Sequence, residues 1–317
     1  MRIAVIDLGT NTFNLLIVEQ ENGSINTLYN EKISVKLGRG GIGNNIIKPD
    51  AFNRGLTALN AQKQAITNYK AEKVIALGTS ALRTAENSQE FIRSVKEQIG
   101  IDIDIITGER EAELIYKGVL QTLSDITGNM LILDIGGGSN EFILANNKEI
   151  IWKESFNLGM ARLLEQFSIS DPVLPEEIIA LEKHFDKVLK PLFEIVKKVP
   201  IDYFVGAEGS FEAFHNIINY MLRPNFHPQK TNKAKTLSHD DFHRLHETLI
   251  RSTSLQRMKM KGLEPYRVEM VVPATIFVDY ILKHITTKQF FVSPHSLKEG
   301  AAWEAIHEQQ VTIGISQ

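Results

Sequence analysis

A glycine-rich turn between two apolar segments, at residues 131–144, constrains the fold more than any other stretch of the chain. The apolar run that ends at Leu133 predicts a short buried strand, and the segment after the turn predicts a second one. Gly136, Gly137 and Gly138 allow positive φ and a close approach of the backbone to a bulky group. Several amide N–H groups in such a turn can point at one anion, most often phosphate. The stretch therefore predicts a phosphate-binding hairpin, with an ordinary glycine turn as the alternative.

Two carboxylates flank this turn, because Asp134 enters it and Glu141 leaves it. Carboxylates beside a phosphate suit a hard divalent cation such as Mg²⁺, held partly through water. Mn²⁺ accepts the same oxygen ligands, so the sequence leaves the choice of metal open. On the other interpretation, the two acids are incidental to the turn.

The N-terminal segment Ile3–Val18 repeats the same layout of apolar strand, Asp-x-Gly, small polar turn and second apolar strand. Asp7 takes the place of Asp134, at a separation too long for a solenoid period and suited to a domain-sized duplication. Two like domains would place their hairpins facing each other across a cleft. The sequence thus predicts two phosphate-binding hairpins in one protein.

The length of 317 residues also suggests two domains. The formal charge of −3 gives no overall basic field, so we expect no nucleic-acid partner, and a polyanion would need a local patch. The absence of cysteine excludes disulfides, thiolate metal sites and cysteine nucleophiles, and it fits a reducing cytoplasm. No apolar run approaches ~18 residues, and Met1 leads directly into a strand, so neither a membrane span nor a signal peptide is expected.

Hydrophobic periodicity and turn residues predict strands alternating with helices in both halves of the chain. Further strands are expected at 24–35, 74–77, 101–106, 149–156, 201–205 and 289–292. Helices are expected at 49–69, 90–99, 175–196, 240–250, 265–285 and 297–308. The polar segment 223–235 is expected to be a loop.

Two helix starts could carry chemistry. Gly78–Ala85 follows a strand, which favours anion binding at the helix N-terminus, and Arg83 offers a planar fork for phosphate oxygens. A surface arginine is the alternative. The helix that begins near Thr107 carries three glutamates close to its start, and a favourable interaction with the helix dipole explains such acids without catalysis.

The histidines and tryptophans give weaker signals. His243 and His246 lie one helical turn apart without a third ligand nearby, so a solvated helix face is favoured over a metal pair. His295 follows a strand end, and a place near the cleft is the less favoured interpretation. Trp152 and Trp303 are interpreted as core or interface residues.

Five motifs, in the right order, resemble those of the exopolyphosphatase / guanosine pentaphosphate phosphohydrolase (Ppx/GppA) family. The five motifs are Ala4–Phe13, Gly78–Arg83, Ile106–Tyr116, Asp134–Glu141 and Gly262–Arg267 with Pro273–Ala274. Ser293–Gly300 also resembles the closing turn of the family, so the resemblance spans nearly the whole chain. Five motifs in this order are far more specific than any one of them.

The resemblance implies an α/β fold with two ribonuclease H-like domains around a cleft, as in the sugar kinase / actin superfamily. Domain I would comprise residues 1–123 and a returning C-terminal helix at 301–317, and domain II would comprise 124–300. Longer family members carry extra helical C-terminal domains, so this chain resembles the short, two-domain form, with limited processivity. A homodimer is the family-level expectation.

The resemblance also implies roles for individual residues. Glu111 matches the catalytic glutamate that orients or deprotonates the attacking water. Asp134 and Glu141 match positions associated with the metal and the water, and Asp7 is a further candidate near the metal. The candidate phosphate-binding residues are Thr10, Asn11, Thr12, Arg83, Gly136, Gly137, Gly138, Ser139 and Arg267.

The chain departs from the family pattern at several internal places, including threonines in Ala4–Phe13 where serines are common. Arg110 replaces a frequent acid beside Glu111, which alters the charge there. The loop at 206–210 replaces a Gly-Gly-Thr-like loop, which argues against a contact with a nucleotide base. Asn140 stands where threonine is usual.

The sequence therefore predicts a cytoplasmic, Mg²⁺-dependent exopolyphosphatase that releases orthophosphate from inorganic polyphosphate, with guanosine pentaphosphate as the alternative substrate. Catalysis would rest on positioning and on electrostatic stabilisation of the phosphoryl group. An ATP-using kinase or ATPase of the same superfamily is one rival, and the altered 206–210 loop argues against it. A non-catalytic polyphosphate or alarmone sensor is another, and retention of Glu111, Asp134 and Glu141 argues against that.

Overall fold

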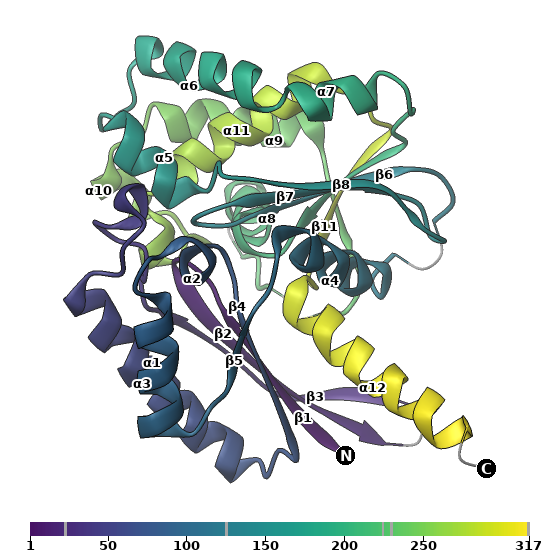
Figure 1. The fold of residues 1–317 in the computed structure, drawn as a ribbon. Helices are drawn as coiled ribbons and strands as arrows, with labels where there is room; N and C mark the ends of the chain where they lie inside the picture. The colour runs from purple at the N-terminus through teal and green to yellow at the C-terminus, as the bar shows by residue number, and fades with distance from the viewer. Residues whose placement is uncertain (22–23, 124–125, 224, 229–230, 316–317) are drawn as a thin grey trace. The chain divides into compact units, whose positions relative to one another are not determined.

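The computed structural model of the chain describes residues 1–317 except 22–23, 124–125, 224, 229–230 and 316–317. It divides into two compact units (Figure 1). Unit 1 comprises Met1–Gly118, Gly136–Gly138 and His295–Gln317, and unit 2 comprises Val119–Ile135 and Ser139–Pro294. These boundaries fall a few residues before those expected from the sequence, and the glycine turn of the second hairpin is grouped with unit 1.

Unit 1 is built on a five-stranded mixed sheet in the order β3-β2-β1-β4-β5. Three strands form an antiparallel meander: β1 (Arg2–Leu8), β2 (Thr12–Glu21) and β3 (Ser24–Ser34). Beside β1, the strands β4 (Lys73–Gly78) and β5 (Ile103–Ile105) continue the sheet in parallel. The near-continuous apolar sequence of β1 and β2 buries both faces of these two strands.

Helices pack on this sheet and on one another. They are α1 (Pro49–Asn68), α2 (Ser80–Thr84), α3 (Ser88–Ile99), α4 (Gly108–Leu120) and α12 (Leu297–Ile315), with the 3₁₀ turn η1 (Ile42–Asn44). Helix α1 packs on β2, and α12 packs on β1 and β2. A Cβ atom on Gly300 would lie 1.8 Å from the carbonyl oxygen of Leu114, so the backbones of α12 and α4 touch where they cross. This crossing anchors the helix that carries Glu111.

Unit 2 is built on a six-stranded mixed sheet in the order β10-β11-β9-β6-β7-β8. The antiparallel meander is β6 (Met130–Ile135), β7 (Asn140–Ala145) and β8 (Ile150–Phe156). The parallel strands are β9 (Tyr203–Ala207) and β11 (Gln289–Ser293), and β10 (Lys235–Leu237) pairs antiparallel at the edge. The prediction of a loop through residue 235 is wrong at its end, since three residues are too few to show a strand alternation.

The two sheets share one connectivity. Each begins with a three-stranded meander whose first strand then receives two parallel strands, so β3-β2-β1-β4-β5 corresponds to β8-β7-β6-β9-β11. The predicted α/β fold class, with two sheets of ribonuclease H type, is confirmed. The duplication of the hairpin in the sequence reflects a duplication of the whole sheet.

The helices of unit 2 are α5 (Met160–Phe167), α6 (Pro175–Val188), α7 (Lys190–Val196), α8 (Gly209–Leu222), α9 (His239–Ile250), α10 (Ser254–Arg257) and α11 (Val271–His284), with the 3₁₀ turn η2 (Pro265–Arg267). The single helix predicted from Pro175 to Val196 is wrong. Pro191 has no amide hydrogen, and its ring would clash with a carbonyl of the preceding turn. Helix α6 therefore ends at Val188, and the proline lies in the first turn of α7.

Two other helix predictions need correction. The helix expected at 265–285 is divided, because η2 occupies its first residues and α11 begins only at Val271. The last helix extends past Glu308 to Ile315. Helix α10 is an addition, and its four residues are too few to show a period; a capping box between Thr253 and Gln256 starts it.

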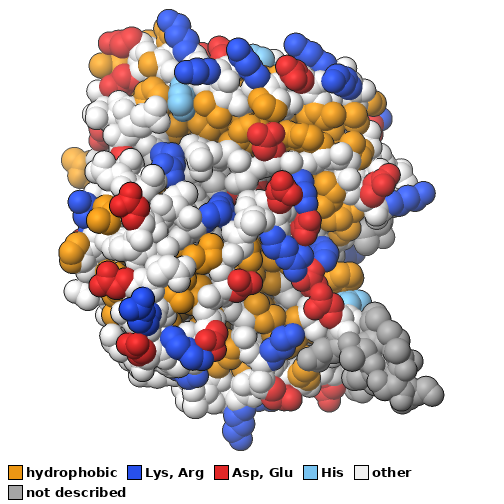
Figure 2. All heavy atoms as spheres, in the orientation of Figure 1, with side chains coloured by type: hydrophobic (Ala, Val, Ile, Leu, Met, Phe, Trp, Pro, Cys, Tyr) orange, Lys and Arg blue, Asp and Glu red, His pale blue; other side chains and the backbone are white. Residues whose placement is uncertain are grey.

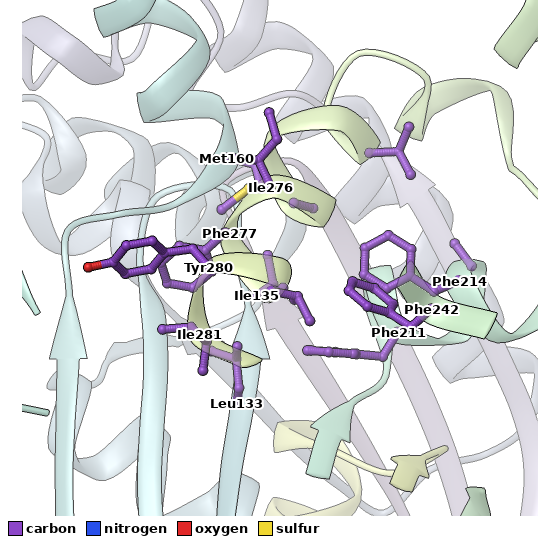
Figure 3. Packing of buried hydrophobic residues seen from close by; sticks show 14 of the residues in the cluster. Leu133, Ile135, Met160, Phe211, Phe214, Phe242, Ile276, Phe277, Tyr280 and Ile281 are labelled. Carbon is purple, nitrogen blue, oxygen red and sulfur yellow. The ribbon is translucent and has the colours of Figure 1, made fainter. Parts of the chain in front are cut away.

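The core of unit 2 is rich in aromatic rings (Figure 3). Phe211, Phe214 and Phe242 gather on one side of the cluster, and the Phe214 and Phe242 rings meet edge to face with centroids 5.4 Å apart. On the other side, Phe277 lies next to Tyr280 and Ile276. Leu133 and Ile135 contribute to this cluster from β6, so the strand that bears Asp134 is held by the core on either side of that residue.

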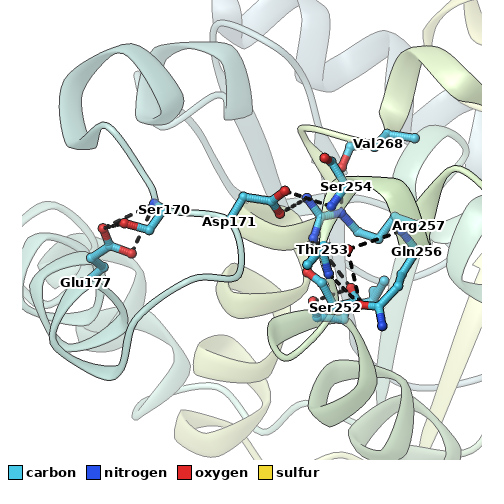
Figure 4. A network of polar contacts seen from close by, with 10 residues as sticks. Ser170, Asp171, Glu177, Ser252, Thr253, Ser254, Gln256, Arg257 and Val268 are labelled. Atoms are coloured by element: carbon cyan, nitrogen blue, oxygen red, sulfur yellow. Dashed lines mark hydrogen bonds and ion pairs between the residues drawn. The ribbon is translucent and has the colours of Figure 1, made fainter.

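A buried arginine ties together the segments around α10 (Figure 4). Arg257 is 5% exposed, and its Nε donates to the carbonyl oxygen of Val268 at 3.0 Å. Its Nη1 donates to the carbonyl oxygen of Ser252, and its Nη2 pairs with Asp171 at 2.8 Å. Burial alone would raise the pKa of Asp171, but hydrogen bonds from Ser254 and Arg257 hold that pKa below its ordinary value. Arg257 thereby fixes the chain next to Arg267.

We expect Arg257→Met to lower the free energy of unfolding by about 2–4 kcal/mol, because two carbonyl oxygens and one carboxylate lose their charged donor. The measurement is urea denaturation. The matched control is Arg251→Met, whose side chain is 76% exposed and pairs with Glu247 one turn away, and it should cost no more than about 0.5 kcal/mol. Equal losses in the two variants would contradict a structural role for Arg257.

The surface in view carries charges of both signs, since Figure 2 shows basic and acidic side chains interspersed over it. This mixture agrees with the small net charge of −3. None of the helices in the described part of the chain is both long and apolar enough to span a membrane.

Candidate active site

The first hairpin places Asp7 at the end of β1, directly opposite Asn14 on β2. The Asn14 side-chain amide donates to Asp7 Oδ2 at 2.7 Å. The turn between the strands is tight, because the amide of Gly9 donates to the carbonyl oxygen of Thr12 at 3.0 Å. A Cβ atom on Gly9 would lie 2.9 Å from that oxygen, which explains why the Asp-x-Gly pattern needs glycine here.

Two buried hydroxyl groups converge on the glycine turn at 136–138 within unit 1. Thr10 and Ser80 are 4% and 3% exposed, and in the described part of the chain neither hydroxyl oxygen has a hydrogen-bond partner. A Cβ atom on Gly138 would lie 2.5 Å from Ser80 Oγ and 2.6 Å from Thr10 Oγ1. Gly137 approaches Thr10 and Asn11 in the same way, at 3.1 and 3.4 Å from their Cβ atoms. Buried hydroxyls without protein partners, beside a glycine backbone, form a cradle suited to phosphate oxygens.

Glu111 and Arg83 form an ion pair in the same unit. Arg83 Nη1 lies 3.0 Å from Glu111 Oε2, and it also donates to the carbonyl oxygen of Ile106 at 2.9 Å. Glu111 is 8% exposed in the first turn of α4, whereas Glu109 in that turn is exposed. Of the two, only Glu111 is thus placed in a buried polar setting. The arginine expected to hold phosphate therefore also orients the expected catalytic glutamate.

The second hairpin brings two carboxylates together in unit 2. Asp134 on β6 lies directly opposite Glu141 on β7, and Glu141 lies directly opposite Ser155 on β8. Glu141 is 2% exposed. Its Oε1 accepts hydrogen bonds from Ser139 Oγ at 2.6 Å and from Ser155 Oγ at 2.7 Å. The Ser139 hydroxyl, expected to face phosphate, thus donates to a carboxylate.

In each sheet, one residue from each strand of the meander lies in a row of directly opposite positions. The equivalent rows of the two sheets carry different functional groups. In the first sheet, the row runs from Asp7 to Asn14 and on to Lys32. In the second sheet, the row runs from Asp134 to Glu141 and on to Ser155. The first row therefore holds one carboxylate next to an amide and a lysine position, and the second holds two adjacent carboxylates.

The Arg267 side chain, from η2, lies beside the N-terminus of α8 in unit 2. A Cβ atom on Gly209, the first residue of α8, would be 3.8 Å from Arg267 Nη1. Arg267 Nε lies 3.2 Å from Glu264 Oε2, and the guanidinium carbon lies 5.1 Å from the centre of the Tyr266 ring. A guanidinium at a helix N-terminus presents positive charge together with amide donors, a combination that binds phosphate.

The carboxylates of the candidate site can be compared with the ligands that Mg²⁺ needs. Within the described ranges, no three histidine, aspartate or glutamate side chains form a group able to hold a metal ion. Mg²⁺ is usually held by one or two carboxylates together with substrate phosphates and water. Asp134 and Glu141, as direct cross-strand neighbours, supply such a pair. The residues fit a metal whose coordination is completed by substrate, and Asp7 supplies a further carboxylate in unit 1.

Two of the departures from the family pattern, Arg110 and the 206–210 segment, have defined surroundings in the structure. Arg110 pairs with Glu113 at 3.3 Å and with Glu304, which also pairs with Lys117, so the arginine joins α4 to α12. The segment 206–210, expected to be a loop, comprises the end of β9, Glu208 and the start of α8. Glu208 has φ of 43° and Gly209 has φ of 50°. A Cβ atom on Gly206 would lie 2.1 Å from the Phe211 ring, so the end of β9 is packed against α8.

The expectation of a solvated face for the histidine pair holds only for His243. Its side chain is 61% exposed, whereas His246 is 5% exposed. Both rings lie near Asp279, at 3.4 and 3.6 Å. Burial lowers the pKa of His246. Helix α9 turns His246 inward because it packs against α11.

The two tryptophans have separate surroundings. Trp152 packs at the edge of the unit 2 core, as expected, and Trp303 stacks on His307 with ring centroids 3.9 Å apart.

Sequence reasoning missed two residues. Ser80 lies inside the Gly78–Arg83 motif, where its position before Arg83 could have indicated it. Ser155 lies outside every motif, and only the register of β7 with β8 brings it to Glu141.

Comparisons with known proteins identify the family of the chain. A model of the Ppx/GppA phosphatase family matches residues 16–309. The crystal structure of an exopolyphosphatase from Cytophaga hutchinsonii has a TM-score of 0.94 and 37% sequence identity, covering 97% of this chain and 98% of that chain.

Two relatives found by sequence carry different names. A Haemophilus influenzae protein provisionally named as an exopolyphosphatase is 28% identical, covering 98% of this chain and 93% of the relative. The guanosine-5'-triphosphate,3'-diphosphate pyrophosphatase of Vibrio vulnificus is 29% identical over 96% of this chain, which spans 59% of that longer relative. The family model covers almost the whole chain, and the chain therefore belongs to the Ppx/GppA phosphatase family.

Proposed function

We propose that this protein is an exopolyphosphatase, which hydrolyses the terminal phosphoanhydride bond of inorganic polyphosphate with Mg²⁺ as cofactor. The observation that carries the proposal is the pair of buried hydroxyls of Thr10 and Ser80, which lack protein partners in the described residues and converge on Gly138. Such groups are costly to bury unless a ligand satisfies them. A terminal phosphoryl group, with several acceptor oxygens, would do so.

In the proposed reaction, a water oxygen attacks the terminal phosphorus in line with the bridging oxygen. The bond from phosphorus to that bridging oxygen breaks, so orthophosphate and a chain shorter by one phosphate are formed. Glu111 orients the water and accepts its proton, a contribution typically worth ~10²–10⁴-fold. Arg83 Nη1 lies 3.0 Å from Glu111 Oε2 and holds it in place. The positive charge of Arg83 would stabilise the phosphoryl oxygens.

Residues of both hairpins bind the phosphates in this proposal. The amides of Gly136–Gly138 and the hydroxyl groups of Thr10, Thr12 and Ser80 surround the terminal phosphoryl group, with Asn11 beside them. Asp134 and Glu141, with Asp7 as a further candidate, would hold Mg²⁺, which supplies charge neutralisation when bound. Arg267, with the N-terminus of α8, would bind a more distant phosphate of the chain.

Guanosine pentaphosphate is a second candidate substrate. The Vibrio vulnificus relative, named for activity on a guanosine substrate, favours it. The 206–210 segment lacks the Gly-Gly-Thr-like sequence expected for a contact with a base, and this favours polyphosphate. The two substrates share the terminal phosphoanhydride, so the same residues would act on either.

The test is phosphate release by purified protein with Mg²⁺ on long-chain polyphosphate, guanosine pentaphosphate and ATP in parallel. We expect the highest kcat/KM on polyphosphate, loss of turnover with EDTA, and recovery when Mg²⁺ is added back. Mn²⁺ should be compared in the same assay. A higher kcat/KM on guanosine pentaphosphate would reverse the proposed preference. If the protein bound polyphosphate but released phosphate from none of the substrates, it would be a sensor and not an enzyme. If it cleaved ATP preferentially, the ATPase alternative would be favoured.

A further inference from the structure

We propose that Ser155, on β8, is a positioning residue for the carboxylate of Glu141. The assignment rests on the proposed function, because Glu141 has a catalytic task only there. Ser155 lies outside the motifs of the family resemblance, and the sheet register brings it directly opposite Glu141. Its hydroxyl donates to Glu141 Oε1 at 2.7 Å.

A carboxylate as buried as Glu141 needs donors for its oxygens, because burial of an unpartnered charge is very costly. Ser139 and Ser155 both donate to Oε1, at 2.6 and 2.7 Å, which is the range of O–H···O⁻ hydrogen bonds. The terminal torsion of a glutamate is intrinsically broad. Two donors on one oxygen restrict that torsion, so Oε2 takes one orientation.

The two serines differ in what else they do. Ser139 adjoins the glycine turn, so a substitution there would also disturb the phosphate cradle. Ser155 comes from a separate strand and is partly buried. Ser155 therefore isolates the effect of carboxylate orientation from the effect of phosphate contact.

The equivalent row of the first sheet has a different residue at the position of Ser155, and the comparison shows why a serine suits Glu141. There, Lys32 occupies the position that corresponds to Ser155, opposite Asn14 instead of a carboxylate. A lysine opposite Glu141 would neutralise its charge, whereas a serine hydroxyl supplies a hydrogen bond and leaves the negative charge in place. The serine thus suits a carboxylate that must act on a cation or a water.

The test compares Ser155→Thr with Ser155→Val, because the two side chains have nearly the same shape and differ in the hydroxyl. We expect Ser155→Val to lower kcat on polyphosphate by about 10-fold. KM should stay within about two-fold, since ground-state binding is unchanged. Ser155→Thr should keep most of the kcat. Ser24→Ala, an exposed serine on β3, is the control and should match the wild type.

The urea unfolding midpoint is measured for both variants. Ser155→Val should unfold at a lower urea concentration than Ser155→Thr, because Glu141 loses one donor, and both should be fully folded under the assay conditions, which separates orientation from folding. Equal kcat in the two Ser155 variants and the wild type would overturn the assignment and leave the proposed function intact. Equal loss in both variants would also overturn it, because packing and not the hydroxyl would then be responsible. If the wild-type protein released no phosphate, the proposed function would be wrong, and the assignment of Ser155 would fall with it.

Discussion

Glu111→Gln is expected to lower kcat on polyphosphate by about 10²–10⁴-fold while the protein remains folded. The amide oxygen of glutamine can still accept the hydrogen bond that Arg83 Nη1 makes at 3.0 Å, so the local structure is kept. An amide cannot accept a proton from water at neutral pH. The substitution therefore removes basicity and retains shape, and turnover with its substrate dependence is measured by phosphate release.

The control for this variant lies in the same helical turn. Glu109→Gln changes the same functional group at an exposed position and should leave kcat unchanged, apart from a small loss of stability at the helix N-terminus. If both variants lost turnover equally, the negative charge at the start of α4 would be responsible for the loss, and not the role of Glu111 as a base. If Glu111→Gln kept full turnover, Glu111 would have no part in the chemistry.

Gly138→Ala is the second substitution with a large expected effect. The added methyl group would lie 2.5 Å from Ser80 Oγ, 2.6 Å from Thr10 Oγ1 and 3.0 Å from Ile42 Cδ1. All three neighbours belong to the packed interior of unit 1, so the turn must shift. We expect kcat/KM to fall by about 10²-fold, because a displacement of about 1 Å disrupts the alignment of reacting groups. The free energy of unfolding should fall by about 1–3 kcal/mol.

The neighbouring glycine provides the comparison. In Gly137→Ala, the added Cβ atom would approach Thr10 Cβ at 3.1 Å, which demands a smaller adjustment. Its kcat/KM should therefore fall less than that of Gly138→Ala when both are measured on the same polyphosphate. The reverse order would place the phosphate elsewhere than against Gly138.

The sequence by itself determined the two hairpins, because an Asp-x-Gly turn between two apolar segments is compatible with few other local structures. It also determined most of the alternating helices and strands, where periodicity is strong and caps are clear. The composition excluded cysteine chemistry. The order of the motifs led to the family, which the family model confirms. The amphipathic period alone misled at Pro191, where the local rule that proline ends a helix should have overridden the continuous pattern. At β10 and α10 the elements are too short to produce a period.

Only the tertiary structure decided which polar groups meet. Ser155 reaches Glu141 through the register of β7 with β8, and no local pattern fixes that register. Arg83 reaches Glu111 because β4 and β5 run in parallel and bring α2 to the start of α4. The hydroxyls of Thr10 and Ser80 lie beside Gly138, although these residues are distant in the sequence. Residue types and turns are local properties, whereas pairs of side chains depend on strand register and helix crossing, which the whole core sets.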